Sequence, residues 1–247
     1  MSNVMKKTND LTEKQFLSQY NIHDFEVPLT TVDMAIFALI DQKLHVLLVQ
    51  RNDHPFKGEW ALPGGFIDLK KDKTINDTAH RKLLEKTGIH SPYMEQVQTI
   101  GQAKRDPRAW SVTILYFALI DYFTITSKGI VPSTEQAQWL SLEQAQNLSL
   151  AFDHQQLLNL ATNRLRSKTR YTALPISLMP EYFTLTELQN SFEIILGHEL
   201  DKKAFRRRVL DAGIIKPTDM NKRSGKRDAQ LFCINQIPLD FEFPRAI

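Results

Sequence analysis

Residues 60–88 combine a short β segment, a tight turn and a helix, and this combination decides much of the N-terminal fold. The β segment over 60–66 is broken by a Pro-Gly-Gly turn at 63–65. Residues 74–86 follow as an amphipathic helix, and Gly88 is placed to end it in the left-handed conformation. The apolar residues that define this helix recur every four positions: Ile75, Ala79 and Leu83.

Strand and helix patterns surround this segment and predict a mixed α/β domain. A hairpin signal at 41–43 separates two β-rich runs, and two further strands follow the amphipathic helix. A capping box, Ser141 to Gln144, opens a short helix, and a longer basic-ended helix covers 154–170. The four predicted strands cover 32–40, 44–50, 96–101 and 110–120.

The last third of the chain has a different pattern. A second capping box, Thr184 to Glu187, begins a helix that ends at Gly197, and Asp201 is placed to cap a helix over 202–212. Two short strands, 214–215 and 231–234, flank a basic tip at 221–227. Helix, turn, basic helix and basic hairpin together predict a winged helix-turn-helix, with residues 171–180 as the linker before it.

Positive charge is concentrated in that part of the chain. Residues 201–230 hold ten Lys or Arg and four Asp, a net +6, so the other residues sum to −3 within the total of +3. Such a block indicates a polyanionic partner. A solvated lysine-rich face is the alternative that charge alone leaves open.

Composition excludes several protein classes. The longest stretch without a charged residue, 109–120, has 12 residues, whereas a membrane-spanning helix needs about 20. Residues 1–10 have lysines but no apolar run, so we expect no secretory signal. Cys233 is the only cysteine, which excludes a disulfide framework within one chain. We therefore expect a cytoplasmic protein without a membrane partner.

The segment 65–89 resembles the Nudix box, whose pattern is Gly-x5-Glu-x7-Arg-Glu-U-x-Glu-Glu-x-Gly-U with U aliphatic. The tail of the pattern reads RKLLEKTGI at 81–89, and LPGGFID at 62–68 matches its front. Two extra residues lie between Gly65 and Arg81. If they precede the first box glutamate, Lys73 takes its place.

The resemblance implies that three box positions would hold Mg²⁺ in a working hydrolase. Here these positions are Lys82, Glu85 and Lys86, so their formal charge changes from −3 to +1. Because an ammonium group cannot ligate a hard cation, we expect metal-dependent hydrolysis to be lost or severely weakened. The same lysines are suited to pair with a diphosphate directly, which predicts metal-free nucleotide binding with no cofactor required. The alternative is that both lysines extend past the core to solvent.

Over residues 25–237 the chain resembles the Nudix-related transcriptional regulators of NAD metabolism, the NrtR family. The resemblance rests on several segments in order: VQR at 49–51, PFKGEWALPGGFID at 55–68, RDPR at 105–108, AFDH at 151–154 and FRRR at 205–208. It implies a Nudix α/β/α sandwich with a C-terminal winged helix-turn-helix domain. The expected parts are an arm over 1–24, an effector-binding domain over 25–170, the linker over 171–180 and the DNA-binding domain over 181–247.

The resemblance also implies a repressor of NAD synthesis or salvage genes, released from its operator by ADP-ribose or a related nucleotide. Effector-binding positions would be Arg51, Gly64, Gly65, Phe66, Arg81, Lys82, Glu85, Lys86, Arg108, Phe152 and His154. A structural role is the alternative for each of them. For example, Arg81 could brace the box helix through Glu85, and His154 could merely begin its helix.

For the DNA-binding helix, periodicity turns Phe205, Val209 and Ala212 inward and Lys203, Arg206 and Arg207 outward. The full set of expected DNA-binding residues is Lys202, Lys203, Arg206, Arg207, Arg208, Lys222, Arg223, Lys226 and Arg227. Since one winged helix reads few base pairs, we expect a homodimer on a palindromic operator in double-stranded DNA.

Two other functions stay open at this point. An active Nudix hydrolase, an ADP-ribose pyrophosphatase with an accessory nucleic-acid-binding domain, would need carboxylates from outside the altered box, such as Asp68, Asp72 or Asp77. An RNA-binding or general polyanion-binding adaptor would bind nucleic acids without sequence preference or response to nucleotides. The sequence does not determine the operator, the regulated genes or the effector among NAD-derived nucleotides.

Overall fold

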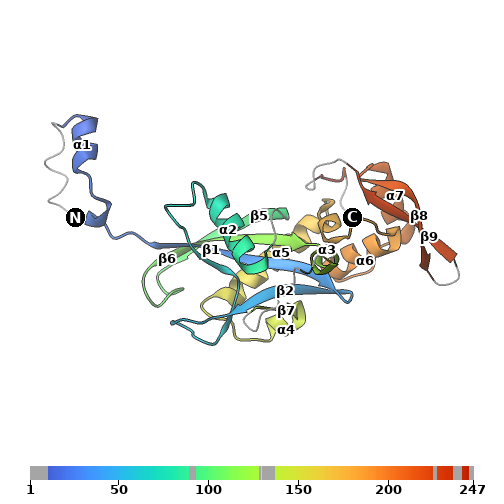
Figure 1. The fold of residues 1–247 in the computed structure, drawn as a ribbon, viewed down its shortest axis with the longest axis horizontal. Helices are drawn as coiled ribbons and strands as arrows, with labels where there is room; N and C mark the ends of the chain where they lie inside the picture. Colours follow the sequence, from blue (N-terminus) through green and yellow to red (C-terminus); the bar gives the residue numbers. More distant parts are fainter. Residues whose placement is uncertain are drawn as a thin grey trace.

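The computed structural model describes residues 11–88, 93–127, 129, 137–224, 227–235 and 241–244. The N-terminal arm, a sheet covered by helices and a C-terminal helical and hairpin region follow one another along an elongated molecule (Figure 1). The strands are β1 Leu29–Ile40, β2 Lys43–Gln50, β3 Trp60–Ala61, β4 Gly64–Phe66, β5 Tyr93–Gln102, β6 Ser111–Ile120, β7 Ala137–Ser141, β8 Ile215–Ser224 and β9 Arg227–Ile234. The α-helices are α1 Glu13–Gln19, α2 Ile75–Thr87, α3 Tyr122–Ser127, α4 Leu142–Gln146, α5 His154–Thr169, α6 Leu185–Leu196 and α7 Lys202–Asp211, with 3-10 helices η1 Ile22–Asp24 and η2 Leu174–Leu178.

A mixed seven-stranded sheet forms the centre of the larger domain. Its main order is β3-β2-β1-β6-β5, with β4 paired to β1 and β7 paired to β2. The β1 and β6 strands run parallel, and the other pairs are antiparallel. At the β1–β2 turn, Asp41 and Gln42 both have positive φ, 47° and 57°. Two such residues suit the twist of a tight hairpin.

Strand β1 is buried on both faces, and its alternating side chains enter two separate apolar cores. Met34 and Ile36 join the core beneath α2, with Ala79 and Leu83. Phe37, from the opposite face, joins a core that includes residues of α4 and α5. Because side chains of a strand alternate between faces, one apolar run supplies both layers. The expected α/β/α sandwich is confirmed.

Local signals placed the helix ends correctly. Ser141 and Thr184 each form the expected capping box with the residue three positions later, and Thr74 forms a further one with Asp77. Gly88 and Gly197 end α2 and α6 in the left-handed conformation, with φ of 70° and 78°. Capping depends on groups a few residues apart, which explains why these ends can be predicted from the sequence alone.

Two elements of the sandwich were not foreseen. Helix α3 and strand β7 lie in a part of the chain for which the sequence pattern gave no assignment. Strand β7 has only five residues and is fixed by its pairing with β2 over His45–Ser141 to Val49–Ala137. A short edge strand of this kind is stabilised by its neighbour, so its own sequence carries little signal.

The C-terminal region has the expected helix-turn-helix and hairpin. Helices α6 and α7 enclose a third apolar core with the hairpin, built around Phe192, Phe205 and Phe232. The hairpin strands β8 and β9 are longer than predicted, because the register between them extends from Ile215–Ile234 to Ser224–Arg227. Much of the expected basic tip is therefore strand.

The segment expected as the linker, 171–180, is part of the packed structure. Its central part forms η2, in which Leu174 and Leu178 enter the core of the sheet domain and Ile176 enters that of the winged helix. Thr172 also forms a β-bridge with Glu242. Prolines and a composition change suggested a connector, but the apolar side chains between them fill both cores.

The expected N-terminal arm is described from residue 11 and contains α1, none of whose seven residues is buried. Among the described helices, none is both long and apolar enough to cross a membrane.

A partly buried cluster of charges joins β5 to α5. Glu95 accepts hydrogen bonds from the Lys168 ammonium, from Arg164 Nη2 at 2.7 Å and from Tyr93 OH at 2.6 Å. Burial acts to raise the pKa of Glu95, but these hydrogen bonds outweigh it and hold the pKa below its ordinary value. The cluster fixes the C-terminal half of α5 on the sheet.

We expect Glu95→Ala to lower the free energy of unfolding by about 2–3 kcal/mol, because the buried Lys168 loses its counter-charge. Exposed Glu199→Ala is the control and should change little. Since the folded-state pKa of Glu95 is depressed, its contribution is complete above its ordinary pKa, about 4.3, and is lost as the pH falls through the depressed value. Urea unfolding at pH 7 and at more acidic pH checks both points, and equal stability of Glu95→Ala and wild type at pH 7 would contradict the first.

Candidate functional site

A cleft of about 530 Å³ opens among β1, β2, the turn at 62–66, the loop at 105–108 and the start of α5. Eight of the eleven predicted effector residues line it: Arg51, Gly64, Gly65, Phe66, Glu85, Arg108, Phe152 and His154. Arg81 and Lys82 are not among the lining residues, and the side chain of Lys86 lies outside the described residues. The cleft is the place where the separate segments of the sequence motif meet.

Aromatic and guanidinium groups form one wall of the cleft. The guanidinium carbon of Arg51 lies 4.7 Å from the centre of the Phe152 ring, and that of Arg108 lies 5.3 Å from the Phe66 ring. The Phe152 backbone has a φ of 57°, which is unusual for a bulky residue. Stacked aromatic and cationic groups suit a ligand that combines a flat ring with negative charge.

Backbone carbonyls fix Arg51 in this wall. Its Nε donates to Pro55 O at 2.8 Å, and its Nη2 donates to Asp53 O at 3.2 Å. Burial and the neighbouring Arg108 lower the pKa of Arg51. Asp106 offsets part of this positive charge, because its carboxylate accepts from Arg108 Nε at 3.0 Å and from Arg108 Nη2 at 2.7 Å.

The floor of the cleft is a buried polar network that the motif analysis missed. Arg105 donates two hydrogen bonds to Asp153, both of 3.0 Å, one of 3.1 Å to Ser111 Oγ and one of 3.4 Å to Asp33. Asp33 and Arg105 are each about 6% exposed. Asp33 is a charged residue within the largely apolar β1 run, but the sequence does not show which residue it meets.

His154 begins α5 and also lines the cleft, where it belongs to this floor. Its Nδ1 accepts a hydrogen bond from the Leu62 N–H at 2.9 Å, which leaves Nε2 as the protonated nitrogen, 3.9 Å from Asp33 Oδ1. Burial lowers the pKa of His154. The ring is therefore neutral at physiological pH and links the Pro-Gly-Gly turn to α5.

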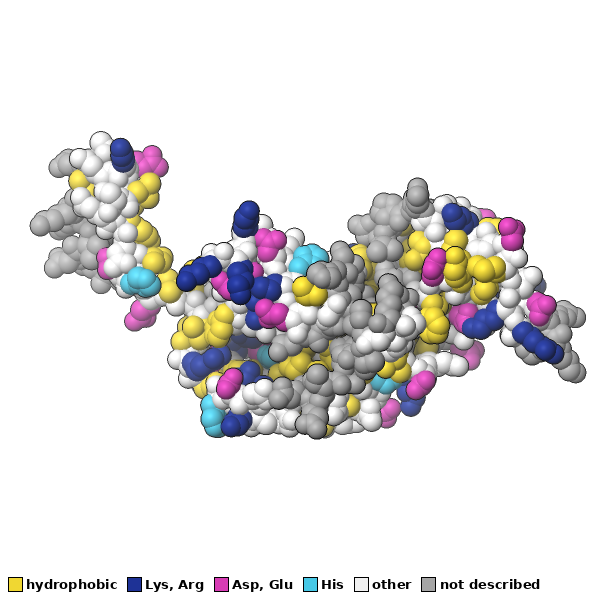
Figure 2. Space-filling model, viewed as in Figure 1, with side chains coloured by type: hydrophobic (Ala, Val, Ile, Leu, Met, Phe, Trp, Pro, Cys, Tyr) yellow, Lys and Arg dark blue, Asp and Glu magenta, His cyan; other side chains and the backbone are white. Residues whose placement is uncertain are grey.

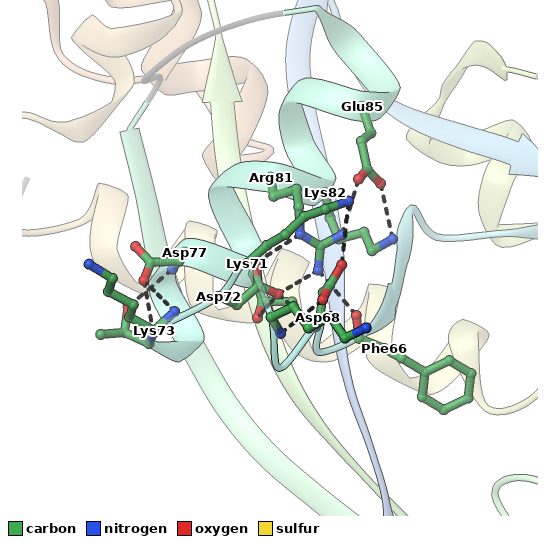
Figure 3. Close-up of polar contacts among 12 residues, drawn as sticks. Phe66, Asp68, Lys71, Asp72, Lys73, Asp77, Arg81, Lys82 and Glu85 are labelled. Carbon is green, nitrogen blue, oxygen red and sulfur yellow. Dashed lines mark hydrogen bonds and ion pairs between the residues drawn. The ribbon is translucent and has the colours of Figure 1, made fainter.

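Arg81 braces the turn against the box helix, as the structural alternative proposed (Figure 3). It donates through Nε to Asp72 Oδ1 at 2.8 Å, through Nη1 to Glu85 at 3.0 Å and through Nη2 to Phe66 O at 3.3 Å. The hydrogen bonds from Arg81 hold the pKa of Asp72 far below its ordinary range. Arg81 therefore holds the turn in position without lining the cleft itself.

Lys82 lies on the inner side of α2, as its position in the sequence predicts. Its side chain is 18% exposed, and its Nζ lies 3.0 Å from Glu85 Oε2 (Figure 3). Burial acts to raise the pKa of Glu85, but hydrogen bonds from Lys82 and Arg81 outweigh it and keep the pKa below its ordinary value. A Cβ on Gly65 would lie 2.9 Å from Lys82 Cε, so the lysine stem occupies the space that a glycine leaves free.

The carboxylates around the box are engaged in hydrogen bonds and ion pairs with neighbouring residues. Asp72 also accepts from Thr78 Oγ1 and the Asp68 N–H, and Asp77 caps α2 through Thr74. Asp68 accepts from the Lys70 N–H and pairs with Lys71. Across the described residues, no three His, Cys, Asp or Glu side chains are grouped closely enough to hold a metal ion. Mg²⁺ prefers oxygen ligands, and in the described residues these carboxylates are engaged by backbone N–H, hydroxyl and cationic groups.

Helix α7 presents most, but not all, of its basic residues to solvent. Phe205 and Val209 are buried, Ala212 is half-buried, and Lys203 and Arg207 are exposed as predicted. The prediction that Arg206 points away is wrong, because this residue is half-buried and its Nη2 donates to Thr186 Oγ1 of α6 at 3.1 Å. The helical arc alone does not show that α6 lies within reach of a long arginine side chain.

The hairpin places further cations near the same helices. Lys222 and Arg223 are both exposed, and Lys222 Nζ lies 2.6 Å from Glu187 Oε1 at the start of α6. Lys226 lies outside the described residues, as does the side chain of Arg227. Of the expected DNA-binding residues, Lys202 is exposed and Arg208 is half-buried.

Known proteins resemble both domains. A NUDIX domain model matches residues 29–161, and the model of the NrtR DNA-binding winged helix domain matches residues 175–234. The ADPR responsive transcriptional repressor NtrR of Acinetobacter baylyi is 56% identical over 241 residues, which are 98% of this chain and 96% of that protein.

Two solved structures extend the comparison. Shewanella oneidensis NrtR complexed with a 27mer DNA is 41% identical, with a TM-score of 0.81 over 88% of this chain and 99% of that one. The NUDIX domain of the same protein complexed with ADP ribose is 43% identical, with a TM-score of 0.56 over 63% of this chain and 99% of that one. The chain therefore belongs to the NrtR family and joins a NUDIX domain to an NrtR DNA-binding winged helix domain.

Proposed function

We propose that this protein is a transcriptional repressor that leaves its operator when ADP-ribose or a related NAD-derived nucleotide occupies the NUDIX cleft. Its relatives support both DNA and ADP-ribose as ligands. One relative is an ADPR responsive repressor, and the two related structures are complexes with DNA and with ADP ribose. A regulator of this kind works beside the chromosome, in keeping with the cytoplasmic location expected from the sequence.

The observation that carries the proposal is the position of α5 between the two ligand sites. This helix begins at the cleft with His154, and near its other end Arg166 Nε donates to Ile195 O of α6 at 3.2 Å. Leu165 of α5 and Ile195 of α6 share one apolar core. An effector that prefers one position of α5 thereby prefers one arrangement of the DNA-binding helices.

Coupling of this kind is reciprocal. If the nucleotide weakens operator binding by some factor, operator DNA weakens nucleotide binding by the same factor. We expect one operator to engage a homodimer, with the two winged helices on the two halves of a palindrome, because a single recognition helix contacts few base pairs.

Mobility-shift assays on promoters of NAD synthesis and salvage genes test the function directly. We expect a retarded protein–DNA complex that ADP-ribose dissociates and that AMP leaves intact. NAD is added in a third titration of the same series. Complexes with every DNA fragment, unchanged by nucleotides, would instead support the general polyanion-binding adaptor.

The altered box supports regulation without turnover. In the place of three metal-binding carboxylates the chain has Lys82, Glu85 and Lys86, and Glu85 is paired with Lys82 and Arg81. We infer that the cleft binds the diphosphate without a metal ion and does not cleave it. Cations of the wall and of α2 supply the charge that Mg²⁺ supplies in a hydrolase.

The double substitution Lys82→Glu/Lys86→Glu is expected to weaken metal-free ADP-ribose binding at least about tenfold, because the diphosphate then meets three carboxylates. Titration calorimetry in the presence of EDTA measures this. The control Lys14→Glu/Lys43→Glu makes the same charge change on exposed residues that are outside the box and do not line the cleft. Unchanged affinity of the first variant would refute the role of the two lysines.

Hydrolysis is measured separately on the wild-type protein. Incubation with ADP-ribose and Mg²⁺ or Mn²⁺ should leave the nucleotide intact over the time in which a NUDIX hydrolase converts it to AMP and ribose phosphate. Rapid conversion would favour the ADP-ribose pyrophosphatase alternative.

For the DNA end, we expect Arg207→Ala to lower operator affinity by about 1–3 kcal/mol and to relax sequence preference, because exposed arginines of a recognition helix read guanine. Lys216→Ala removes the same charge at the opposite end of the hairpin from its tip and serves as the control. Fluorescence anisotropy with operator and scrambled DNA distinguishes the two effects. If both variants weaken binding equally, α7 does not read the operator.

A further inference from the structure

The N-terminal arm carries a row of apolar side chains that the described chain does not cover. Phe16, Leu17 and Tyr20 from α1 and its C-cap are 38%, 61% and 47% exposed. Ile22, Phe25 and Val27 continue the row at 48%, 52% and 56%. The Tyr20 ring contacts the rings of Phe16 and Phe25, with centroids 5.6 and 5.7 Å apart. A contiguous apolar row of this size indicates a binding surface.

The arm points away from its own domain. Tyr20 and Phe25 have extended backbone, and Pro28 prevents a helix from running into β1. The chain between α1 and β1 continues outward from the end of the sheet (Figure 1), and hydrophobic side chains lie along it (Figure 2). At about 3.3 Å per extended residue and about 2 Å per residue in η1, residues 20–28 span at most roughly 26 Å.

The surface around the root of the arm has complementary properties. Leu69 is 91% and Trp110 48% exposed, and the Leu29 N–H at the root donates to Trp110 O. Exposed lysines are close to both residues in the sequence: Lys70 and Lys71 follow Leu69, and Lys104 precedes Trp110. Dark blue side chains are grouped on the body near the arm in Figure 2. Residues 11–28 have three acidic side chains, Glu13, Asp24 and Glu26, and one lysine, Lys14, so the arm is acidic and this surface is basic.

The amount of apolar surface is suited to a dimer. Aromatic side chains present about 150–250 Å² each, so six half-exposed apolar side chains on each of two arms offer roughly 1,000 Å² before the receiving surface is counted. Stable interfaces bury about 1,200–2,000 Å² in total. Two arms and the two surfaces that receive them reach that range.

We propose that residues 12–27 of each chain dock onto the Leu69–Trp110 surface of a second copy, so that exchanged arms hold the homodimer together. A two-fold axis near the two roots makes the contact reciprocal, each arm crossing to the other body. The acidic charge of the arm favours this basic surface and disfavours DNA as its partner. The inference rests on the proposed function only in taking the protein to be a dimer.

Sedimentation velocity on the full-length chain tests the arm. The variant Phe16→Ser/Tyr20→Ser/Phe25→Ser should dissociate at protein concentrations at least about a hundredfold higher than wild type, because aromatic anchors dominate interfaces. The control Lys14→Ser/Gln19→Ser alters exposed polar residues of the same arm and should stay dimeric.

The receiving surface is tested by cross-linking in a Cys233→Ser background. Leu17→Cys protein mixed with Leu69→Cys protein should form a disulfide-linked pair, whereas Leu17→Cys mixed with Lys216→Cys should not. Because each protein has a single cysteine, any such disulfide joins two chains.

The outcomes separate this inference from the proposed function. A dimer that survives the triple substitution, a monomeric wild type, or the absence of the Leu17–Leu69 cross-link would overturn the arm contact. ADP-ribose binding by the triple variant, measured by calorimetry, should match wild type. Loss of ADP-ribose response in the wild type would instead count against the repressor function and leave the arm contact standing.

Discussion

The paired hydrogen bonds between Arg105 and Asp153 fix where α5 begins, and the position of α5 organises the rest of the molecule. Asp153 is the N-cap residue of α5 but makes no side-chain cap hydrogen bond, because its carboxylate is engaged by Arg105. The same arginine contacts Asp33 in the central strand. Sheet, cleft and helix are thereby held in one arrangement at the buried end of the cleft. Breaking one partner of such a buried ion pair leaves an uncompensated charge.

From that anchor α5 runs along the sheet to the winged helix, and the interactions along it change in kind. Polar contacts hold its first turn, and apolar side chains pack beneath its middle. In its last turns, Arg164 donates to Glu95 and Arg166 donates to the Ile195 carbonyl. A helix attached at both ends moves as one body more readily than it bends. This gives the two ligand sites a physical connection without a contact between them.

Local and motif-based features of the molecule could be predicted from the sequence, and its long-range contacts could not. The capping boxes at Ser141 and Thr184 depend on groups three residues apart, and the cleft residues near the Pro-Gly-Gly turn belong to one recognisable motif. Arg105 and Asp33 meet across 72 residues of sequence, so neither position alone indicates the network. Arg206 shows the same limit, since the arc of α7 predicts an exposed side chain whereas α6 offers a hydroxyl within reach. Residues 171–180 were assigned as a linker from their prolines, but the apolar side chains between them complete two cores.

The ion pair between Lys222 and Glu187 affects how this protein would respond to ionic strength. A free lysine that neutralises a phosphate releases a condensed cation from the double helix, and this release makes binding sensitive to salt. Lys222 already has the Glu187 carboxylate 2.6 Å away. If a DNA phosphate replaces Glu187 as the partner of Lys222, Glu187 is free to attract a cation from solution. The cation released from DNA and the cation taken up by Glu187 offset each other. A count of phosphate contacts based on the salt dependence of binding would therefore miss this lysine, even if it touches the backbone of the operator.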